Sequence, residues 1–318
     1  MQVKKIPLPF CGVALGLAAL GNLVGANGFG QIIPAFKALN VYGPILKNIF
    51  GIISAIILVL LLIKILSDVK GFVEEMKNPI TASVFGTYSM TLMILSGYIP
   101  SSLIWWVGFI MHIIIMIYFT ITFVFKFNIK QVFTSWYIVY VGIVAMNINC
   151  KQFGQQALGE IVFYFGFVCT LILLCLVMYR IYVVKEIPDP AKPLFCINTA
   201  PVSLCLAGYM TTFADKNSGL IYFMLVLSLL IYLLVLIYLP GLLKMPFFPS
   251  YAAFTFPMVI SAIACKLTTA QYLGGEVKAN PGLASITKNI FQIQTWIALI
   301  LVLYVLIRFV QFICKNEK

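Results

Sequence analysis

The stretch SYAAFTFPMVISAIACK, residues 250–266, is the most informative part of the chain. It is apolar enough for a bilayer, yet it mixes bulky aromatic side chains with small Ala and Ser side chains. Pro257 stands near its middle and Lys266 at its end. A helix that faces only lipid gains nothing from such a proline, because the carbonyl groups that it frees find no partner in hydrocarbon. The stretch therefore predicts a helix inside a bundle, lining an internal space.

The composition places the whole chain in a membrane. Of its 318 residues, 62% are hydrophobic and 9% are charged, which no water-soluble domain of this length shows. The net charge of +12 is interpreted as the usual excess of Lys and Arg at cytoplasmic membrane borders, and nucleic-acid binding is not expected. The eight cysteines stand singly, which favours small buried side chains over metal or disulfide sites. No cofactor and no metal are expected.

The hydropathy pattern predicts ten transmembrane helices in a single domain, residues 1–318, because each apolar run is close to the length that a span requires. Lys and Arg fall fourteen to seven in favour of the side that holds both termini, so both termini are expected to be cytoplasmic in a multi-pass protein of the cell membrane. The predicted spans are 8–29, 44–66, 81–99, 101–125, 132–150, 158–183, 194–213, 217–240, 250–272 and 284–313.

The spans alternate in character along the chain. Odd spans mix small, polar and aromatic residues, whereas even spans are almost uniformly apolar. Small residues allow helices to approach closely or leave room for a passage, and greasy helices suit lipid or packed neighbours. We therefore predict an all-α integral membrane protein of five helical hairpins in a quasi-fivefold ring, with odd helices inside lining a pore and even helices outside. The alternative is a compact bundle in which the small residues serve only packing.

Three stretches resemble one family, the tellurite-resistance and C4-dicarboxylate transporters, which include the plant slow-type anion channels. They are PLPFCGVALGLAALGN at 7–22, the third predicted span at 81–98, and FTFPMVIS at 254–261, which is similar to the family's T-F-P-M signature. Cys11 and Ala14 stand at positions where the family pattern varies. The resemblance covers nearly the whole chain. It implies five hairpins in a ring and a homotrimer with one anion pore in each subunit.

The resemblance also implies roles for single residues. The phenylalanine of T-F-P-M blocks the pore midway in that family, which makes Phe256 the expected gate. A large ring across a narrow apolar lumen excludes water and so stops ions. The alternative is that Phe256 is an ordinary aromatic residue that packs in the core. Pore helices in the family bend near prolines, so Pro257 and Pro201 are the expected kinks that support the gate. Spans 1, 3 and 5 have no such proline.

Small and polar residues of the odd spans are the other site candidates. Lys266 is expected at the outer mouth, where it attracts anions or simply extends to the membrane surface. Hydroxyl and amide groups can replace part of an anion's hydration shell, and hydrogen bonding between helices is the alternative. The predicted pore-lining residues are Gly12, Gly16, Ala19, Ser83, Gly86, Thr87, Gly142, Asn198 and Ser261.

The acidic residues fall in loops and tails, with Glu160 at the start of a span. Cation-coupled carriers and cation channels commonly place carboxylates inside the membrane. Because no predicted span carries one near its middle, neither class is expected here. The single histidine, His112, lies in a greasy span and is expected to be structural rather than a proton relay. The sequence holds no Ser/His/Asp set or acid pair for catalysis, so no enzyme activity is expected.

These features predict a gated channel that passes small monovalent anions, such as chloride or nitrate, through an apolar pore. The alternative is a carrier for larger anions, such as malate and other C4-dicarboxylates, sulfite or tellurite-type oxyanions. A carrier of dianions needs a cation well inside the membrane, and Lys266 is the pore-helix candidate for it. A third alternative is a membrane scaffold or receptor that transports nothing.

Overall fold

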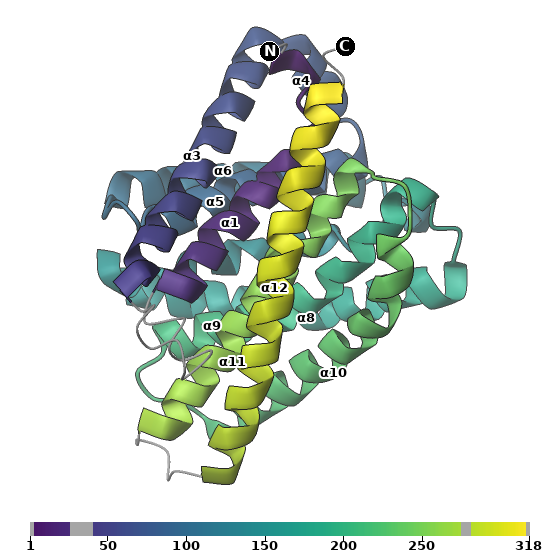
Figure 1. The fold of residues 1–318 in the computed structure, drawn as a ribbon. Coiled ribbons are helices and arrows are strands. Elements are labelled where there is room, and N and C mark those ends of the chain that lie inside the picture. Colours follow the sequence, from purple (N-terminus) through teal and green to yellow (C-terminus); the bar gives the residue numbers. More distant parts are fainter. Residues whose placement is uncertain (1–2, 26–40, 275–280, 316–318) are drawn as a thin grey trace.

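The computed structural model describes residues 3–25, 41–274 and 281–315, and the regular elements in these ranges are all helices (Figure 1). Seven of the helices are long and apolar enough to cross a membrane. Two further apolar helices, α1 (Phe10–Gly25) and α5 (Pro79–Leu95), are shorter. The prediction of an α-helical membrane protein with several spans is confirmed.

Most of the long helices begin and end close to the bounds of the predicted spans. Asn78 and Asn217 cap α5 and α10 with side-chain oxygens that accept backbone N–H groups, which explains why these helices begin where they do. The other α-helices are α3 (Gly43–Ser67), α4 (Val69–Glu75), α6 (Ser102–Phe119), α7 (Trp136–Tyr140), α8 (Gln156–Tyr179), α9 (Ala200–Thr212), α10 (Ser218–Leu243), α11 (Phe256–Gly274) and α12 (Pro281–Lys315). The short 3₁₀ helices are η1 (Val3–Lys5), η4 (Ile129–Gln131), η5 (Gly142–Ile148), η6 (Lys151–Phe153), η8 (Asp189–Thr199) and η9 (Pro249–Phe254), and π-helical turns η3 (Thr120–Val124) and η7 (Arg180–Val184) end two long helices.

Burial separates the elements into inner segments and outer helices. In the most apolar 18 residues of the segments Asp189–Thr212 and Pro249–Ala270, 89% and 83% of the residues are buried, against 33% in the outer helix Ser102–Val124. α1 and α5 are buried along nearly their whole length. Large apolar side chains such as Ile52, Ile172 and Ile237 are exposed on outer helices α3, α8 and α10. The outer helices therefore present an apolar surface suited to contact with lipid.

The inner segments contact one another in a closed order. α1 contacts α5, α5 contacts α7 and η5, η5 contacts α9, α9 contacts α11, and α11 contacts α1. Each outer helix packs on inner segments: α3 on α1, α6 on α5, α8 on η5 and α9, α10 on η8 and α9, and α12 on α11 and α1. In Figure 1, α12 crosses the whole molecule in front of α1 and α11.

Three inner segments depart from the continuous helices that their hydropathy suggested. The predicted span 132–150 is divided into α7 and the 3₁₀ helix η5. Its β-branched and aromatic residues, together with Gly142, have low α-helix propensity, which explains the division. The other two segments begin as 3₁₀ helices and change to α-helix in mid-span. Pro201 and Pro257 lie in the first turn of α9 and α11, where a missing N–H costs no helical hydrogen bond.

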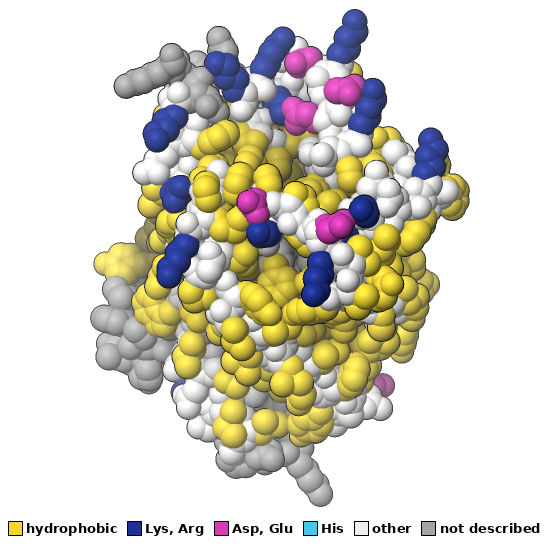
Figure 2. Space-filling model, turned by 90° about the vertical axis from the view of Figure 1, so that its right-hand side faces the viewer, with side chains coloured by type: hydrophobic (Ala, Val, Ile, Leu, Met, Phe, Trp, Pro, Cys, Tyr) yellow, Lys and Arg dark blue, Asp and Glu magenta, His cyan; other side chains and the backbone are white. Residues whose placement is uncertain are grey.

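One end of the molecule carries the two termini and α4, with the ion pairs Lys64–Glu75 and Lys77–Glu74 in or beside α4, and we name it the charged end (Figure 1). Figure 2 shows most of the Lys, Arg, Asp and Glu side chains of one face on its upper half, above a largely hydrophobic surface. The ion pairs of the described residues are Lys64–Glu75 (2.6 Å), Lys77–Glu74 (2.6 Å), Lys130–Glu186 (2.9 Å) and Lys192–Asp189 (2.5 Å).

Candidate functional site

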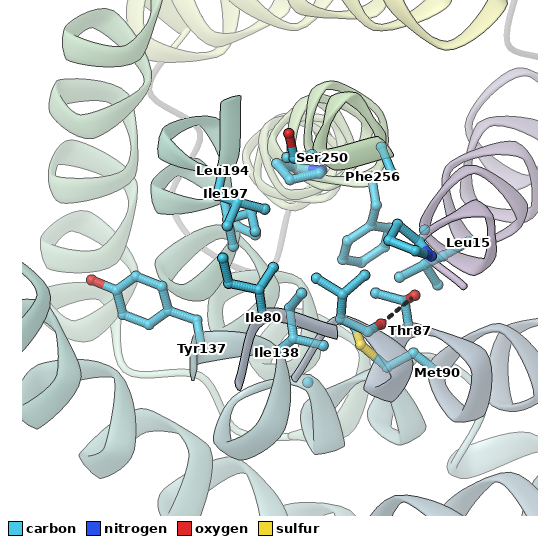
Figure 3. A pocket seen from close by; sticks show the side chains of 18 of the residues that line it. Leu15, Ile80, Thr87, Met90, Tyr137, Ile138, Leu194, Ile197, Ser250 and Phe256 are labelled. Carbon is cyan, nitrogen blue, oxygen red and sulfur yellow. Dashed lines mark hydrogen bonds between the residues drawn. The ribbon is translucent and has the colours of Figure 1, made fainter. Parts of the chain in front are cut away.

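A cavity of about 230 Å³ lies between the five inner segments, and each segment contributes to its wall (Figure 3). Its wall comes from α1, α5, α7 with η5, η8 with α9, and η9 with α11. The lining residues are Pro9, Gly12, Leu15, Asn78, Ile80, Thr81, Val84, Thr87, Met90, Tyr137, Ile138, Val141, Gly142, Pro190, Leu194, Ile197, Ala200, Pro201, Leu204, Phe248, Pro249, Ser250, Ala252, Ala253, Phe256 and Pro257.

The wall of the cavity is mostly apolar and carries a few neutral polar groups. Asn78, Thr81, Thr87 and Ser250 supply amide and hydroxyl groups, and the described lining includes no Asp, Glu, Lys or Arg. Thr87 already donates its hydroxyl hydrogen to the carbonyl of Val84 at 2.8 Å. A cavity of this kind holds neutral dipoles but no fixed charge among its described lining residues, so it offers no strong binding site for an ion.

Residues from the charged end line one part of the cavity, and Phe256 lies deeper. Pro9, Asn78 and Pro249 stand at or just before the starts of inner segments. Figure 3 shows the Phe256 ring inside the cavity, on the same side as Leu15 and Thr87. The ring is 5% exposed, so the surrounding helices hold it in place.

The break between η9 and α11 sets the position of Phe256. Thr255 stands at that break with φ −97° and ψ −92°, and its Oγ1 lies 2.9 Å from the carbonyl oxygen of Gly12 in α1. A Cβ atom on Gly16 would stand 2.5 Å from the Cβ of Thr255 and 3.1 Å from the Phe256 nitrogen. The absence of a side chain at Gly16 therefore allows α1 to lie against the residue that precedes Phe256.

Six of the predicted site residues line the cavity and the others do not. Ser83 hydrogen-bonds Ser135 at 2.7 Å, and Ser261 lies 3.2 Å from Ser203, so these hydroxyls join neighbouring inner segments. A Cβ on Gly86 would lie 3.0 Å from the Cγ2 of Ile138. The lining includes Gly12, Thr87, Gly142, Pro201, Phe256 and Pro257, whereas Gly16, Ala19, Ser83, Gly86, Asn198, Ser261 and Lys266 are outside it.

Lys266 lies on α11 ten residues beyond Phe256, which is roughly 15 Å along a helix. Its Nζ donates to the carbonyl of Leu23 at 3.0 Å and so joins α11 to the last turns of α1. The side chain is partly buried rather than extended into water. Lys266 therefore places a cation beyond Phe256, on the side away from the cavity.

His112 joins an outer helix to two inner segments. Its Nδ1 lies 2.8 Å from Ser89 Oγ, and its Nε2 lies 3.1 Å from the Val139 carbonyl, which can only accept. Nε2 therefore carries a proton and donates to Val139, while Nδ1 faces the Ser89 hydroxyl, which also lies 2.8 Å from the Gly86 carbonyl. Both ring nitrogens are engaged within the protein, which supports a structural role for His112.

Sequence reasoning missed most of the cavity wall. Leu15, Tyr137 and Leu194 look like ordinary core residues because they are large and apolar. One signal was present. In a 3₁₀ helix residues three apart share an edge, and Leu194, Ile197 and Ala200 follow that spacing along η8 and into α9. Only knowledge that this segment is a 3₁₀ helix makes the spacing informative.

The chain matches one protein family over nearly its whole length. Residues 5–310 match the sequence model of SLAC1, described as voltage-dependent anion channel. A search of curated proteins finds no match to the chain.

Proposed function

The chain belongs to the SLAC1 family of voltage-dependent anion channels, and on that premise we propose that it is a gated channel for small monovalent anions such as chloride or nitrate. Members of this family are channels and transporters rather than enzymes, so the family places the protein in anion transport. The cavity shared by the five inner segments, with Phe256 inside it, is the observation that carries the finer proposal.

We propose that the five inner segments form a quasi-fivefold ring around one pore, and that five outer helices surround them to give ten crossings in a single domain. The closed order of contacts from α1 through α5, η5, α9 and α11 supports this arrangement. The strong burial of inner segments and the exposed apolar faces of outer helices support it too. α5 is shorter than a full span, which suits a helix that opens into a cavity at one end.

Phe256 is the proposed gate of this pore. Its ring enters the cavity, and the break at Thr255 together with Pro257 in the first turn of α11 holds it there. A large apolar ring in a narrow apolar passage excludes water, and an ion cannot cross such a section without its hydration. Conduction then requires the ring to move or the passage to widen around it.

Anion selectivity is proposed to come from the charges that surround the pore. Among the described residues the buried charged side chains are Lys64 and Arg180, and neither is acidic. Lys and Arg exceed Asp and Glu by 21 to 9 in the chain. A pore with neutral walls and cationic surroundings lowers the barrier for anions relative to cations. Lys266 adds one cation beyond the gate.

A carrier for larger anions, such as C4-dicarboxylates, sulfite or tellurite-type oxyanions, is the alternative. A dianion bound inside the membrane needs a compensating cation at its binding site. The described lining of the cavity offers none, which favours the channel. Saturable malate uptake by proteoliposomes that show no unitary currents would establish the carrier instead.

The experiment that tests the gate compares two phenylalanines two residues apart. Phe256 lines the cavity, whereas Phe254 is fully buried outside it and packs on Tyr251. We expect Phe256→Ala to raise anion current in oocytes or planar bilayers by at least about tenfold, since it removes the hydrophobic barrier. Phe254→Ala should raise it little at equal surface expression. Equal currents from Phe256→Ala and the unmodified protein would refute the gate.

We also propose that the protein is a homotrimer with one pore in each subunit and that its charged end faces the cytoplasm. The excess of Lys and Arg on the side of the termini supports this orientation. The trimer is proposed from the family resemblance, which covers nearly the whole chain. Native mass spectrometry in detergent would give the subunit number directly.

A further inference from the structure

A second cavity, of about 320 Å³, lies near the charged end on the outer side of η8. Its wall comes from η7, η8, the end of α10 and the approach to α7. The 3₁₀ helix η8 separates it from the pore cavity: Leu194 and Ile197 face the pore, whereas Lys192 and Phe195 line the second cavity. The two cavities thus share one wall.

Arg180 is the unusual residue of this second cavity. It lines the cavity and is only 1% exposed, although it carries a positive charge. Its Nη2 donates to the carbonyls of Glu186 at 3.2 Å and Lys130 at 3.4 Å. Its Nε and Nη1 are buried and have no hydrogen-bond partner in the described part of the chain. A buried guanidinium with unfilled donors is costly unless an acceptor completes it.

No protein carboxylate supplies that acceptor among the described residues. Glu186 is the nearest acid along the chain, and its carboxylate pairs with Lys130 at 2.9 Å. Asp189 pairs with Lys192 at 2.5 Å. The backbone instead turns toward Arg180: Lys185 and Glu186 both have φ 58°, a conformation that favours glycine, and the Glu186 carbonyl accepts from the guanidinium. The Glu186 carboxylate attracts Arg180 but pairs with Lys130, so Nε and Nη1 of Arg180 are left without an acceptor among the described residues.

The rest of the wall selects the kind of anion. Most lining residues are apolar, including Val177, Ile181 and Phe195, and the volume exceeds what an inorganic anion fills. Tyr182 and Tyr238 at the rim are 43% and 46% exposed, and tyrosine is common at the level of lipid head groups. The neighbouring side chains Tyr179 and Ile237 on the same two helices are exposed to the lipid side at 53% and 75%. A ligand with an acidic head group and a hydrocarbon tail fits this cavity, because the head group suits Arg180 and the tail suits the apolar wall.

We propose that this cavity binds an acidic phospholipid of the leaflet at the charged end, with a phosphate oxygen on Arg180 and the start of an acyl chain on the apolar wall. Basic pockets between transmembrane helices at such a border are suited to acidic lipid head groups. Arginine is favoured over lysine for phosphate because its planar group offers several donors. Since η8 is also a wall of the pore cavity, the bound lipid supports the pore from outside.

The test measures lipid binding to the full-length protein in a nonionic detergent by native mass spectrometry. The probes are a short-chain phosphatidylglycerol, the matching phosphatidylcholine and inorganic phosphate. The unmodified protein should bind phosphatidylglycerol at least about tenfold more tightly than phosphatidylcholine, because only the former is acidic. Arg180→Met should bring the two lipids to within about twofold of each other. Arg308→Met is the matched control, because Arg308 lies on α12 and bonds Tyr304 instead, and it should keep the preference.

Each other outcome overturns the proposal. Equal binding of both lipids by the unmodified protein refutes it, and so does an unchanged preference in folded Arg180→Met. Displacement of the lipid by inorganic phosphate at equal concentration would assign the site to a free anion instead. If Arg180→Met does not fold, Ile187→Trp replaces it, because Ile187 lines the cavity from a loop and is only partly buried. That variant should lose phosphatidylglycerol binding, and retention of binding contradicts the assignment of the cavity.

Discussion

At the scale of single residues, Gly16 and Thr255 determine where the Phe256 ring lies. Thr255 interrupts the inner segment, and its hydroxyl lies within hydrogen-bond distance of the Gly12 and Ala252 carbonyls, while Gly16 leaves room for that interruption beside α1. The T-F-P-M resemblance predicted Phe256 as the gate, and Phe256 does line the cavity, whereas its role as a gate stays a prediction. The resemblance could not predict the role of Gly16, which was expected to line the pore, because the direction in which a glycine faces depends on how two helices cross.

Replacement of Gly16 should disturb the gate through packing. Gly16→Ala places a Cβ 2.5 Å from the Thr255 side chain, so we expect a loss of about 1–3 kcal/mol in stability and an altered basal current. Gly241→Ala is the control, since nothing lies within 4 Å of the added Cβ. Thermal melting in detergent and oocyte currents measure both effects. Identical melting curves for the two variants would contradict the close packing.

At the scale of secondary-structure elements, most predicted spans agree with helices to within a few residues. Apolar length and loop charges determine these boundaries, and both are readable from sequence. The sequence did not predict that two inner segments begin with the 3₁₀ helices η8 and η9, or that the span 132–150 is divided. Their geometry depends on contacts between segments, such as the 2.6 Å hydrogen bond from Thr134 to the Leu194 carbonyl. Part of the predicted first span, 26–29, lies outside the described residues.

The break between η9 and α11 can be tested without touching the ring. Thr255→Val removes a hydroxyl that lies 2.7 Å from the Ala252 carbonyl and 2.9 Å from the Gly12 carbonyl, and the hydrogen bond lost is worth about 1 kcal/mol. The variant should raise basal anion current because Phe256 is held less firmly. Thr295→Val is the matched control, because Thr295 is equally buried and bonds only within its own helix. A current increase in Thr295→Val as large as in Thr255→Val would contradict the claim that the break at Thr255 holds Phe256 in place.

At the scale of the whole molecule, charge and burial are distributed as a membrane requires. The termini lie together, charged residues gather toward that end, and the outer helices carry exposed apolar side chains (Figures 1 and 2). Sequence patterns predicted this distribution well, because it follows from composition along each span. They could not predict the second cavity, because Arg180 resembles any other cation at a membrane border until its neighbours are known.

The orientation of the molecule can be measured by cysteine labelling of intact cells. Cys314 is exposed near the C-terminus, so a membrane-impermeant maleimide should label it in inside-out vesicles but not in intact cells. Asp215→Cys introduces a thiol on an exposed loop between α9 and α10 and should be labelled in intact cells. Labelling of Cys314 from outside would invert the proposed topology.

The central claim is that small anions pass through the inner segments when the Phe256 barrier is removed. The reversal potential of Phe256→Ala under a tenfold reduction of external chloride tests it most directly. We expect the reversal potential to shift toward positive values and to approach the single-charge limit of about 59 mV. A potential that does not move with chloride or nitrate, or that follows the cation gradient instead, would contradict it.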